Sequence, residues 1–145
     1  WTREEARRVL GEMLAHVDLL IATEHDCALL LGAQLDRREA LRRLAEEHGL
    51  EAAVMTLGAE GSLAYQHGAH FESPGYELTT VNRLGAGDAF VAGLLYGYMR
   101  QGLQAGLDYG GAMAALKMTI PQNIPVVNRE DVERLLLGRD QDLVR

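Results

Sequence analysis

Short apolar runs that alternate with segments of helical period constrain the fold of this chain most strongly. Residues 17–22 (VDLLIA) and 51–57 (EAAVMTL) are apolar along most of their length, which is typical of strands buried on both faces. Segments with helical spacing of apolar residues lie before, between and after these runs. The alternation therefore predicts an α/β fold in which helices are layered on a largely parallel sheet.

Capping signals mark where the helices begin and end. Thr2 with Glu5, and Thr23 with Asp26, have the spacing of a capping box at a helix N-terminus. Gly49 is a suitable residue to end the helix before it. Further helices are predicted over residues 38–48, from near residue 88, over 105–118 and over 128–137.

A hairpin and one more strand complete the predicted elements. Two glycines in residues 58–61 predict a turn between the strand at 51–57 and a strand at 62–66. The alternating, Thr-rich run from Tyr76 to Val81 predicts a further strand. The length of 145 residues is that of one domain, so we predict a single domain over residues 1–145.

Charge and cysteine content exclude several classes of function. A net charge of −7 repels phosphate backbones and anionic lipids, which excludes nucleic acid and membranes as predicted partners. No run approaches the ~20 apolar residues that a membrane-spanning helix needs. The single cysteine, Cys27, excludes an internal disulfide framework and a multi-cysteine metal site. We therefore expect a soluble, cytoplasmic protein.

Two polar clusters are interpreted as structural. Arginines and glutamates interleave over residues 37–47, which is the pattern of a solvated helix face with i,i+4 pairs. His67 and His70 have a spacing that suits a metal, but the sequence offers no third ligand beside them.

The segment Val81–Phe90 is the strongest candidate for chemistry, because a predicted strand leads through glycines into a helix N-terminus. Gly85 and Gly87 allow the backbone to approach a ligand closely, and the free amides of residues 85–88 can bind an anion. Asp88 lies at the edge of this segment, where a carboxylate could accept the proton of an attacking hydroxyl. The alternative is structural: the glycines shape a turn and Asp88 caps the helix.

Three motifs in the same order resemble those of the ribokinase-like (pfkB) family of carbohydrate kinases. Gly85-Ala86-Gly87-Asp88-Ala89-Phe90 looks like the family's C-terminal signature. The segment Thr56–Gly61 is similar to the family's nucleotide-binding strand and turn, and Thr23-x-x-Asp26 lies where the family has Asn-x-x-Glu. Residues 1–3 and 116–121 look most like those of 2-keto-3-deoxygluconate kinases.

The resemblance implies a three-layer α/β/α ribokinase-like fold and ATP-dependent phosphorylation of a sugar or sugar-acid hydroxyl. The preferred substrate is 2-keto-3-deoxygluconate. Asp88 would be the catalytic base that deprotonates this hydroxyl. The amides of Gly85, Ala86 and Gly87 would form the anion hole around the γ-phosphate of ATP.

The resemblance also implies ATP and Mg²⁺ as cofactors. Asp26 would help to organise Mg²⁺ and its waters, although the acid is one methylene shorter than the family's glutamate. Asn82 replaces the aspartate that opens the family signature, so a charged oxygen that helps to hold a monovalent cation becomes neutral, which weakens the prediction of such a cation. The ATP site would be lined by Thr56, Gly58, Glu60 and Gly61.

Family members are much longer, and the portion that this chain resembles is the C-terminal, nucleotide side. The N-terminal half, with its lid and most sugar contacts, has no counterpart in these 145 residues. We therefore expect the chain to need an N-terminal half or a homo-oligomer partner, as a kinase fragment, one chain of a split assembly or a decayed remnant. The alternative function is a non-catalytic module that binds nucleotide or docks to a partner.

Overall fold

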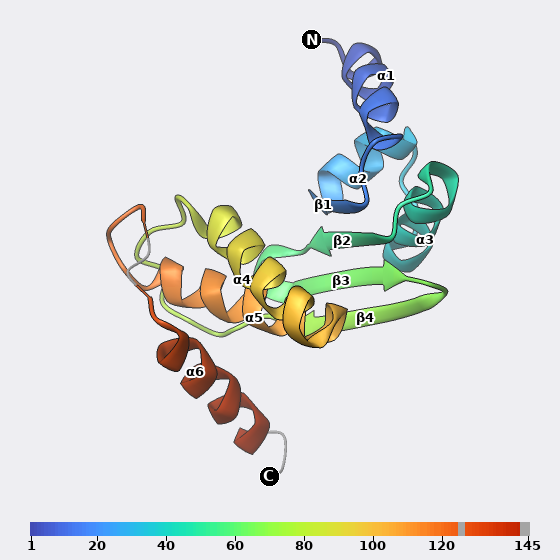
Figure 1. The fold of residues 1–145 in the computed structure, drawn as a ribbon. Coiled ribbons are helices and arrows are strands. Elements are labelled where there is room, and N and C mark those ends of the chain that lie inside the picture. The colour runs from blue at the N-terminus through green and yellow to red at the C-terminus, as the bar shows by residue number, and fades with distance from the viewer. Residues whose placement is uncertain (125–126, 143–145) are drawn as a thin grey trace. The chain divides into compact units, whose positions relative to one another are not determined.

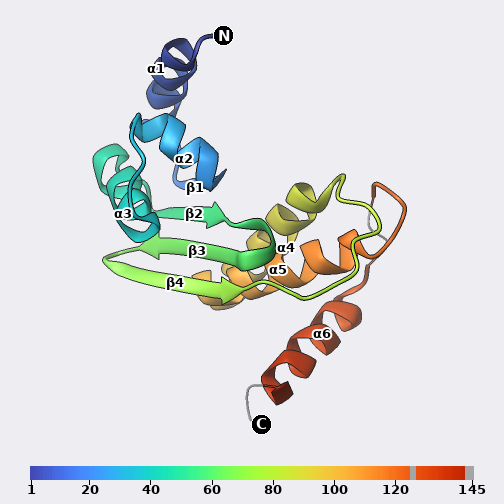
Figure 2. The ribbon, with the colours of Figure 1, turned by 180° about the vertical axis from the view of Figure 1, so that it is seen from behind.

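A computed structural model describes residues 1–124 and 127–142 of the chain (Figure 1 and, from behind, Figure 2). Its contacts divide into two compact units, residues 1–72 and 73–145. In chain order the elements are α1 (Arg3–Leu14), β1 (Leu19–Thr23), α2 (Glu24–Leu31), α3 (Arg37–His48), β2 (Ala52–Thr56), the 3₁₀ turn η1 (Gly58–Glu60), β3 (Gly61–Gln66), β4 (Ala69–Pro74), α4 (Ala86–Gln101), α5 (Leu103–Met118) and α6 (Arg129–Asp142).

The strands form a four-stranded mixed sheet in the order β1-β2-β3-β4. β1 and β2 are parallel, with Leu19 opposite Ala52 and Thr23 opposite Thr56, whereas β2 and β3 are antiparallel. The α/β class is confirmed, but the prediction of a largely parallel sheet is wrong for the described residues. The reason is that η1 is too short for a crossover, which needs a dozen or more residues, so β3 can only return beside β2.

Two strand predictions also need correction. Residues 76–81 form no strand; the regular strand is β4, which ends at Pro74. The amides of Val81 and Asn82 instead donate to the main-chain oxygen of Met118, at 2.8 and 3.2 Å, so this loop is fixed to a helix end. β1 was expected to be buried on both faces, but its side chains are half-buried or exposed because it is the last strand at its side of the described sheet.

The core of the first unit lies between the sheet and the helices α2 and α3. Leu41 and Leu44 of α3 are fully buried and belong to one cluster with Met55 of β2 and Cys27 of α2. Burial raises the pKa of Cys27 to about 12, so its thiol stays protonated at neutral pH and serves as packing. The predicted capping boxes of α1 and α2 are present, and Gly49 ends α3 with a φ of 68°.

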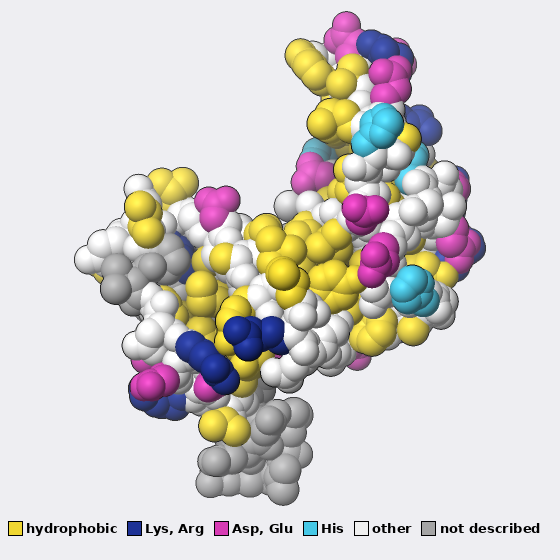
Figure 3. All heavy atoms as spheres, viewed as in Figure 1, with side chains coloured by type: hydrophobic (Ala, Val, Ile, Leu, Met, Phe, Trp, Pro, Cys, Tyr) yellow, Lys and Arg dark blue, Asp and Glu magenta, His cyan; other side chains and the backbone are white. Residues whose placement is uncertain are grey.

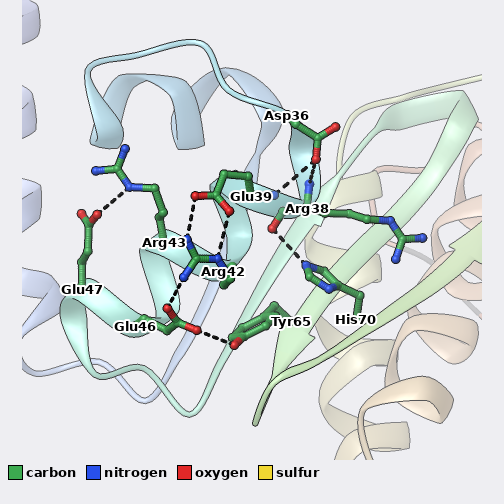
Figure 4. Close-up of polar contacts among 9 residues, drawn as sticks. All are labelled: Asp36, Arg38, Glu39, Arg42, Arg43, Glu46, Glu47, Tyr65 and His70. Atoms are coloured by element: carbon green, nitrogen blue, oxygen red, sulfur yellow. Dashed lines mark hydrogen bonds and ion pairs between the residues drawn. The ribbon is translucent and has the colours of Figure 1, made fainter.

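On the charged face of α3, Arg42 and Arg43 form ion pairs within the helix, as predicted (Figure 4), whereas Arg37 and Arg38 pair with glutamates outside it. Arg43 pairs with Glu47 at 2.6 Å, and Arg42 pairs with both Glu39 and Glu46. The hydroxyl of Tyr65 on β3 donates to Glu46 at 2.6 Å, which ties this face to the sheet. The Nε2 atom of His70, drawn in the same view, donates to the main-chain oxygen of Arg38 at 3.0 Å, so this imidazole has a structural contact.

The second unit is built around α4 and α5, which are joined at Gly102 and pack tightly along their length. Glycines at the interface make this approach possible. A Cβ atom added at Gly93 would lie 2.4 Å from the main-chain oxygen of Tyr109, and one at Gly97 would lie 2.5 Å from that of Ala105. Phe90 and Leu94 of α4 and Leu107 of α5 are buried, and a Cβ atom added at Gly110 of α5 would lie 3.1 Å from the ring of Phe90.

Hydrophobic side chains of α1 remain partly uncovered. Leu10 and Met13 are among the exposed large hydrophobic residues, and Figure 3 shows apolar side chains on one side of this helix and charged ones on the other. Within the described part of the chain, none of the helices combines the length and apolar character that crossing a bilayer requires.

The glycine interface predicts a contrast between two glycine substitutions. Gly93→Ala should lower the free energy of unfolding by about 1–3 kcal/mol, because the new methyl group overlaps the backbone of α5. Gly11→Ala on α1, where a Cβ meets nothing within 4 Å, should instead raise it by about 0.5–1 kcal/mol through helix propensity. Urea unfolding of both variants tests this, and equal effects at the two positions would contradict the interface.

Candidate active site

The glycine segment forms the N-terminus of α4, as predicted. Gly85 is the N-cap with a φ of 85°, a left-handed conformation that favours glycine. A Cβ atom there would also lie 2.5 Å from the main-chain oxygen of Asn123, so any side chain would displace the neighbouring loop. Both constraints hold the turn that directs the first amides of α4.

These amides have the arrangement that an anion site requires. Among the described residues, the amides of Gly85, Gly87 and Asp88 donate no hydrogen bond, whereas Ala86 donates to the main-chain oxygen of Arg83 at 3.1 Å. Three free amides therefore lie at the positive end of a helix of 16 residues. Ala86, expected as part of the anion hole, has its amide engaged within the turn.

Asp88 is exposed in the first turn of α4. Its carboxylate has neither a hydrogen bond nor an ion pair with any residue that the structure describes, and it makes no capping bond to Gly85. An acidic residue that served only as a cap would accept a backbone amide, as Asp26 does on α2. Asp88 is thus available to accept a proton.

Asn82 fixes the loop in front of the glycine segment through its side chain. Its amide nitrogen donates to the main-chain oxygen of Pro121 at 2.8 Å and to Oδ1 of Asn123 at 3.0 Å. Its own Oδ1 accepts the amide of Leu84 at 3.0 Å. A buried lysine that the sequence analysis missed, Lys117, donates from Nζ to the main-chain oxygen of Asn82 at 2.9 Å.

In the first unit, the parallel register brings two predicted segments to one edge of the sheet. Thr23 and Thr56 are opposite each other at the carboxyl ends of β1 and β2. The hydroxyl of Thr56 donates to the main-chain oxygen of Ala22 at 3.5 Å. The carboxyl ends of parallel strands are where ligands bind in open α/β sheets. The start of α2 and the turn at Gly58–Gly61 both follow directly from this edge.

Arg37 links these two segments, a role that spacing alone did not reveal. Its guanidinium binds Glu24 through Nε at 2.7 Å and Nη2 at 3.1 Å, and binds Glu60 through Nη1 at 2.8 Å and Nη2 at 3.1 Å. These hydrogen bonds hold the pKa of both carboxyls below the ordinary value of 4.5. Glu60, expected to contact nucleotide, therefore directs its carboxylate to Arg37.

Asp26 has a capping role that leaves one oxygen free. Its Oδ2 accepts the amide of Thr23 at 3.2 Å and the hydroxyl of Thr23 at 2.6 Å. Among the residues that the structure describes, Oδ1 accepts nothing, and no group of three or more potential metal ligands is present. The exposed Oδ1 suits a water molecule of a hydrated Mg²⁺ ion and does not by itself make a direct binding site.

Comparison with known proteins identifies the family to which this chain belongs. The model of the pfkB family of carbohydrate kinases matches residues 1–125. The chain belongs to this family. The 2-dehydro-3-deoxygalactonokinase of Haloferax volcanii is 35% identical over 146 residues, which cover 100% of this chain and 46% of that protein.

Solved structures show the same fold. The 2-dehydro-3-deoxygluconokinase of Thermotoga maritima has a TM-score of 0.82 and 33% identity, with 95% of this chain and 46% of that chain covered. A fructokinase double mutant from Vibrio cholerae was solved with fructose, ADP and potassium. It has a TM-score of 0.79 and 23% identity, and the match covers 92% of this chain and 45% of that chain. The described residues thus form a portion of the ribokinase-like fold, and the chain spans less than half the length of these relatives.

The Arg37 contacts predict a pH dependence of stability. Because the folded state lowers the pKa of Glu24 and Glu60, their contribution is present at neutral pH and is lost as the pH falls below about 4.5. The free energy of unfolding should therefore fall less steeply between pH 5 and about 3 in Arg37→Met than in the unchanged protein. Denaturant titrations at several pH values measure this. Arg83→Met, which removes an arginine without a partner among the described residues, is the control, and equal slopes for both variants would contradict the assignment.

Proposed function

We propose that this chain is the nucleotide-side portion of a kinase that transfers the γ-phosphoryl group of ATP to a hydroxyl group of a 2-keto-3-deoxy sugar acid. The observation that carries the proposal is the unpaired carboxylate of Asp88 beside free amides at the N-terminus of α4. Membership of the pfkB family supports the reaction class. The two relatives above that exceed 30% identity, a 2-dehydro-3-deoxygalactonokinase and a 2-dehydro-3-deoxygluconokinase, support the substrate class.

In the proposed reaction, Asp88 accepts the proton of the sugar-acid hydroxyl. The hydroxyl oxygen then forms a bond to the γ-phosphorus of ATP while the bond between that phosphorus and the bridging oxygen breaks, which releases ADP. The amides of Gly85, Gly87 and Asp88 donate to the oxygens of the transferring group, where negative charge is concentrated. Because these donors are fixed by the helix, they require no rearrangement during the reaction.

For the nucleotide itself we propose contacts from Thr56, Gly58 and Gly61. Glu60 contributes indirectly, because its bond to Arg37 fixes the turn at Gly58–Gly61. Asp26 would hold water molecules of Mg²⁺ through its free oxygen, and a bound Mg²⁺ would neutralise phosphate charge. The remaining sugar contacts would come from an N-terminal half or from a second copy of the chain.

Substitution of Asp88 tests the base. Asp88→Asn in the full-length protein should lower kcat by about 10²–10⁴-fold, because the amide does not accept the proton. The Kd for Mg-ATP should stay unchanged. Glu130→Gln is the matched control, since Glu130 is also an exposed acid in the first turn of a helix and should affect neither quantity. Coupled assays of ADP release with both 2-keto-3-deoxy epimers measure kcat, and retained turnover in Asp88→Asn would exclude this base.

Substitution of Gly87 tests the anion site. A Cβ atom at Gly87 meets nothing within 4 Å, so Gly87→Val should fold normally while its side chain occupies the space beside the free amides. We expect its affinity for Mg-ATP to fall at least about tenfold, or ~1.4 kcal/mol, by calorimetric titration.

Gly138→Val is the control for the helix-propensity effect of the same change, because Gly138 on α6 is equally uncrowded. Unchanged affinity in Gly87→Val would place the phosphates elsewhere. Nucleotide binding without phosphorylation of any sugar acid by the full-length protein would favour a non-catalytic module, to which the neutral Asn82 and the short acid Asp26 also point.

A further inference from the structure

Lys117 is the single lysine among the 14 basic residues of the sequence, and its side chain is 0% exposed. It lies in the last turn of α5, where its Nζ atom donates to the main-chain oxygen of Asn82 at 2.9 Å. Among the described residues, its side chain forms no ion pair and no other hydrogen bond. A buried charge without a carboxylate partner is costly unless polar groups surround it, so the position of this ammonium requires an explanation.

The surroundings of the ammonium suit a cation. The C-terminal end of α5 carries the negative end of the helix dipole, and the main-chain oxygen of Asn82 points to Nζ. Gly85 lies beside it, because a Cβ atom added at Gly85 would be 3.6 Å from Cε of Lys117 and 2.5 Å from the main-chain oxygen of Asn123. The ammonium is therefore next to the turn that carries the free amides.

The same loop does not fit the monovalent cation that the family resemblance implies at residue 82. Potassium is bound by oxygen atoms, often main-chain carbonyls. Here the side chain of Asn82 presents its N–H groups to Pro121 and Asn123, and its oxygen is used by Leu84. The main-chain oxygen of Asn82 already accepts Lys117, and a second positive charge beside a buried ammonium would be repelled strongly in this low-dielectric region.

The choice of lysine is itself informative. Apart from the histidines, every other basic residue of the chain is arginine, whose planar guanidinium is larger and spreads its charge over three nitrogens. An ammonium is a compact point charge, which makes it the side chain closest in size and charge to a monovalent metal ion. Lysine thus occurs only where the structure buries a cation.

We propose that the ammonium of Lys117 is the built-in cation of the loop 82–85, and that this protein binds no potassium at Asn82. If the proposed function holds, the built-in cation would make phosphoryl transfer independent of monovalent cations. This consequence for catalysis rests on the proposed function. The statement about the cation concerns the chain itself and is tested without activity.

The first experiment uses the single lysine as a probe. In the 145-residue chain labelled with ¹³C-lysine, Lys117 gives the only lysine side-chain signal, which is followed by NMR in potassium chloride and in choline chloride at equal ionic strength. We expect the same Cε shift and the same Tm in both salts. A potassium-specific shift of the signal, or a potassium-specific rise in Tm, would overturn the proposal.

The second experiment replaces the ammonium of Lys117 by a possible site for potassium. The double variant Lys117→Met with Asn82→Asp removes the ammonium and restores a charged oxygen, so it should gain a rise in Tm in potassium that choline does not produce. Lys117→Met alone is the control for loss of the side chain. A double variant that folds but has the same Tm in potassium and in choline would contradict a cation role for Lys117. If neither variant folds, the Cε shift and the Tm of the unchanged protein in the two salts decide whether the proposal holds.

Activity is the third measurement. In the full-length protein, exchange of potassium for choline should change kcat less than about twofold, whereas Lys117→Met should lower it at least about tenfold. Strong activation by potassium would refute the proposal. Absence of phosphorylation in both salts would count against the proposed function alone, because the NMR and Tm measurements test the cation role of Lys117 without depending on activity.

Discussion

Close packing between α4 and α5 determines what the second unit can do. Since the two helices are joined at Gly102 and contact each other along their length, the N-terminus of α4 and the C-terminus of α5 lie at the same end of the pair. Free amides and a buried ammonium are thereby collected around one loop, which Asn82 fixes to the chain after α5. The glycines of the interface thus contribute to the site although they lie far from it along the helices.

Local signals predicted the local structure well. Thr2, Thr23 and Gly49 cap helices as their spacing indicates, and Gly85 opens α4 as the signature suggests. Each of these features depends on atoms within a few residues, so the sequence around them is sufficient. The alternation of helices and apolar strands likewise indicated the α/β class correctly.

Predictions that depend on partners distant in the sequence were less successful. The Thr-rich run at 76–81 has strand character, but the amide of Val81 at its end bonds to the end of α5, and no strand in the described part of the chain pairs with the run. The roles of Arg37 and Lys117 arise only when segments 13 to 35 residues away fold against them. Arg37 was interpreted as part of a solvated face because its neighbours on α3 do form such a face.

Burial of Lys117 has a practical effect on the covalent chemistry of the surface. With its one ε-amine enclosed, the chain offers acylating and cross-linking reagents no lysine to attack while it stays folded. Within these 145 residues, amine-directed coupling would then find no accessible lysine side chain. Modification of Lys117 would report the opening of the α4–α5 pair, so the residue acts as an internal marker of local unfolding.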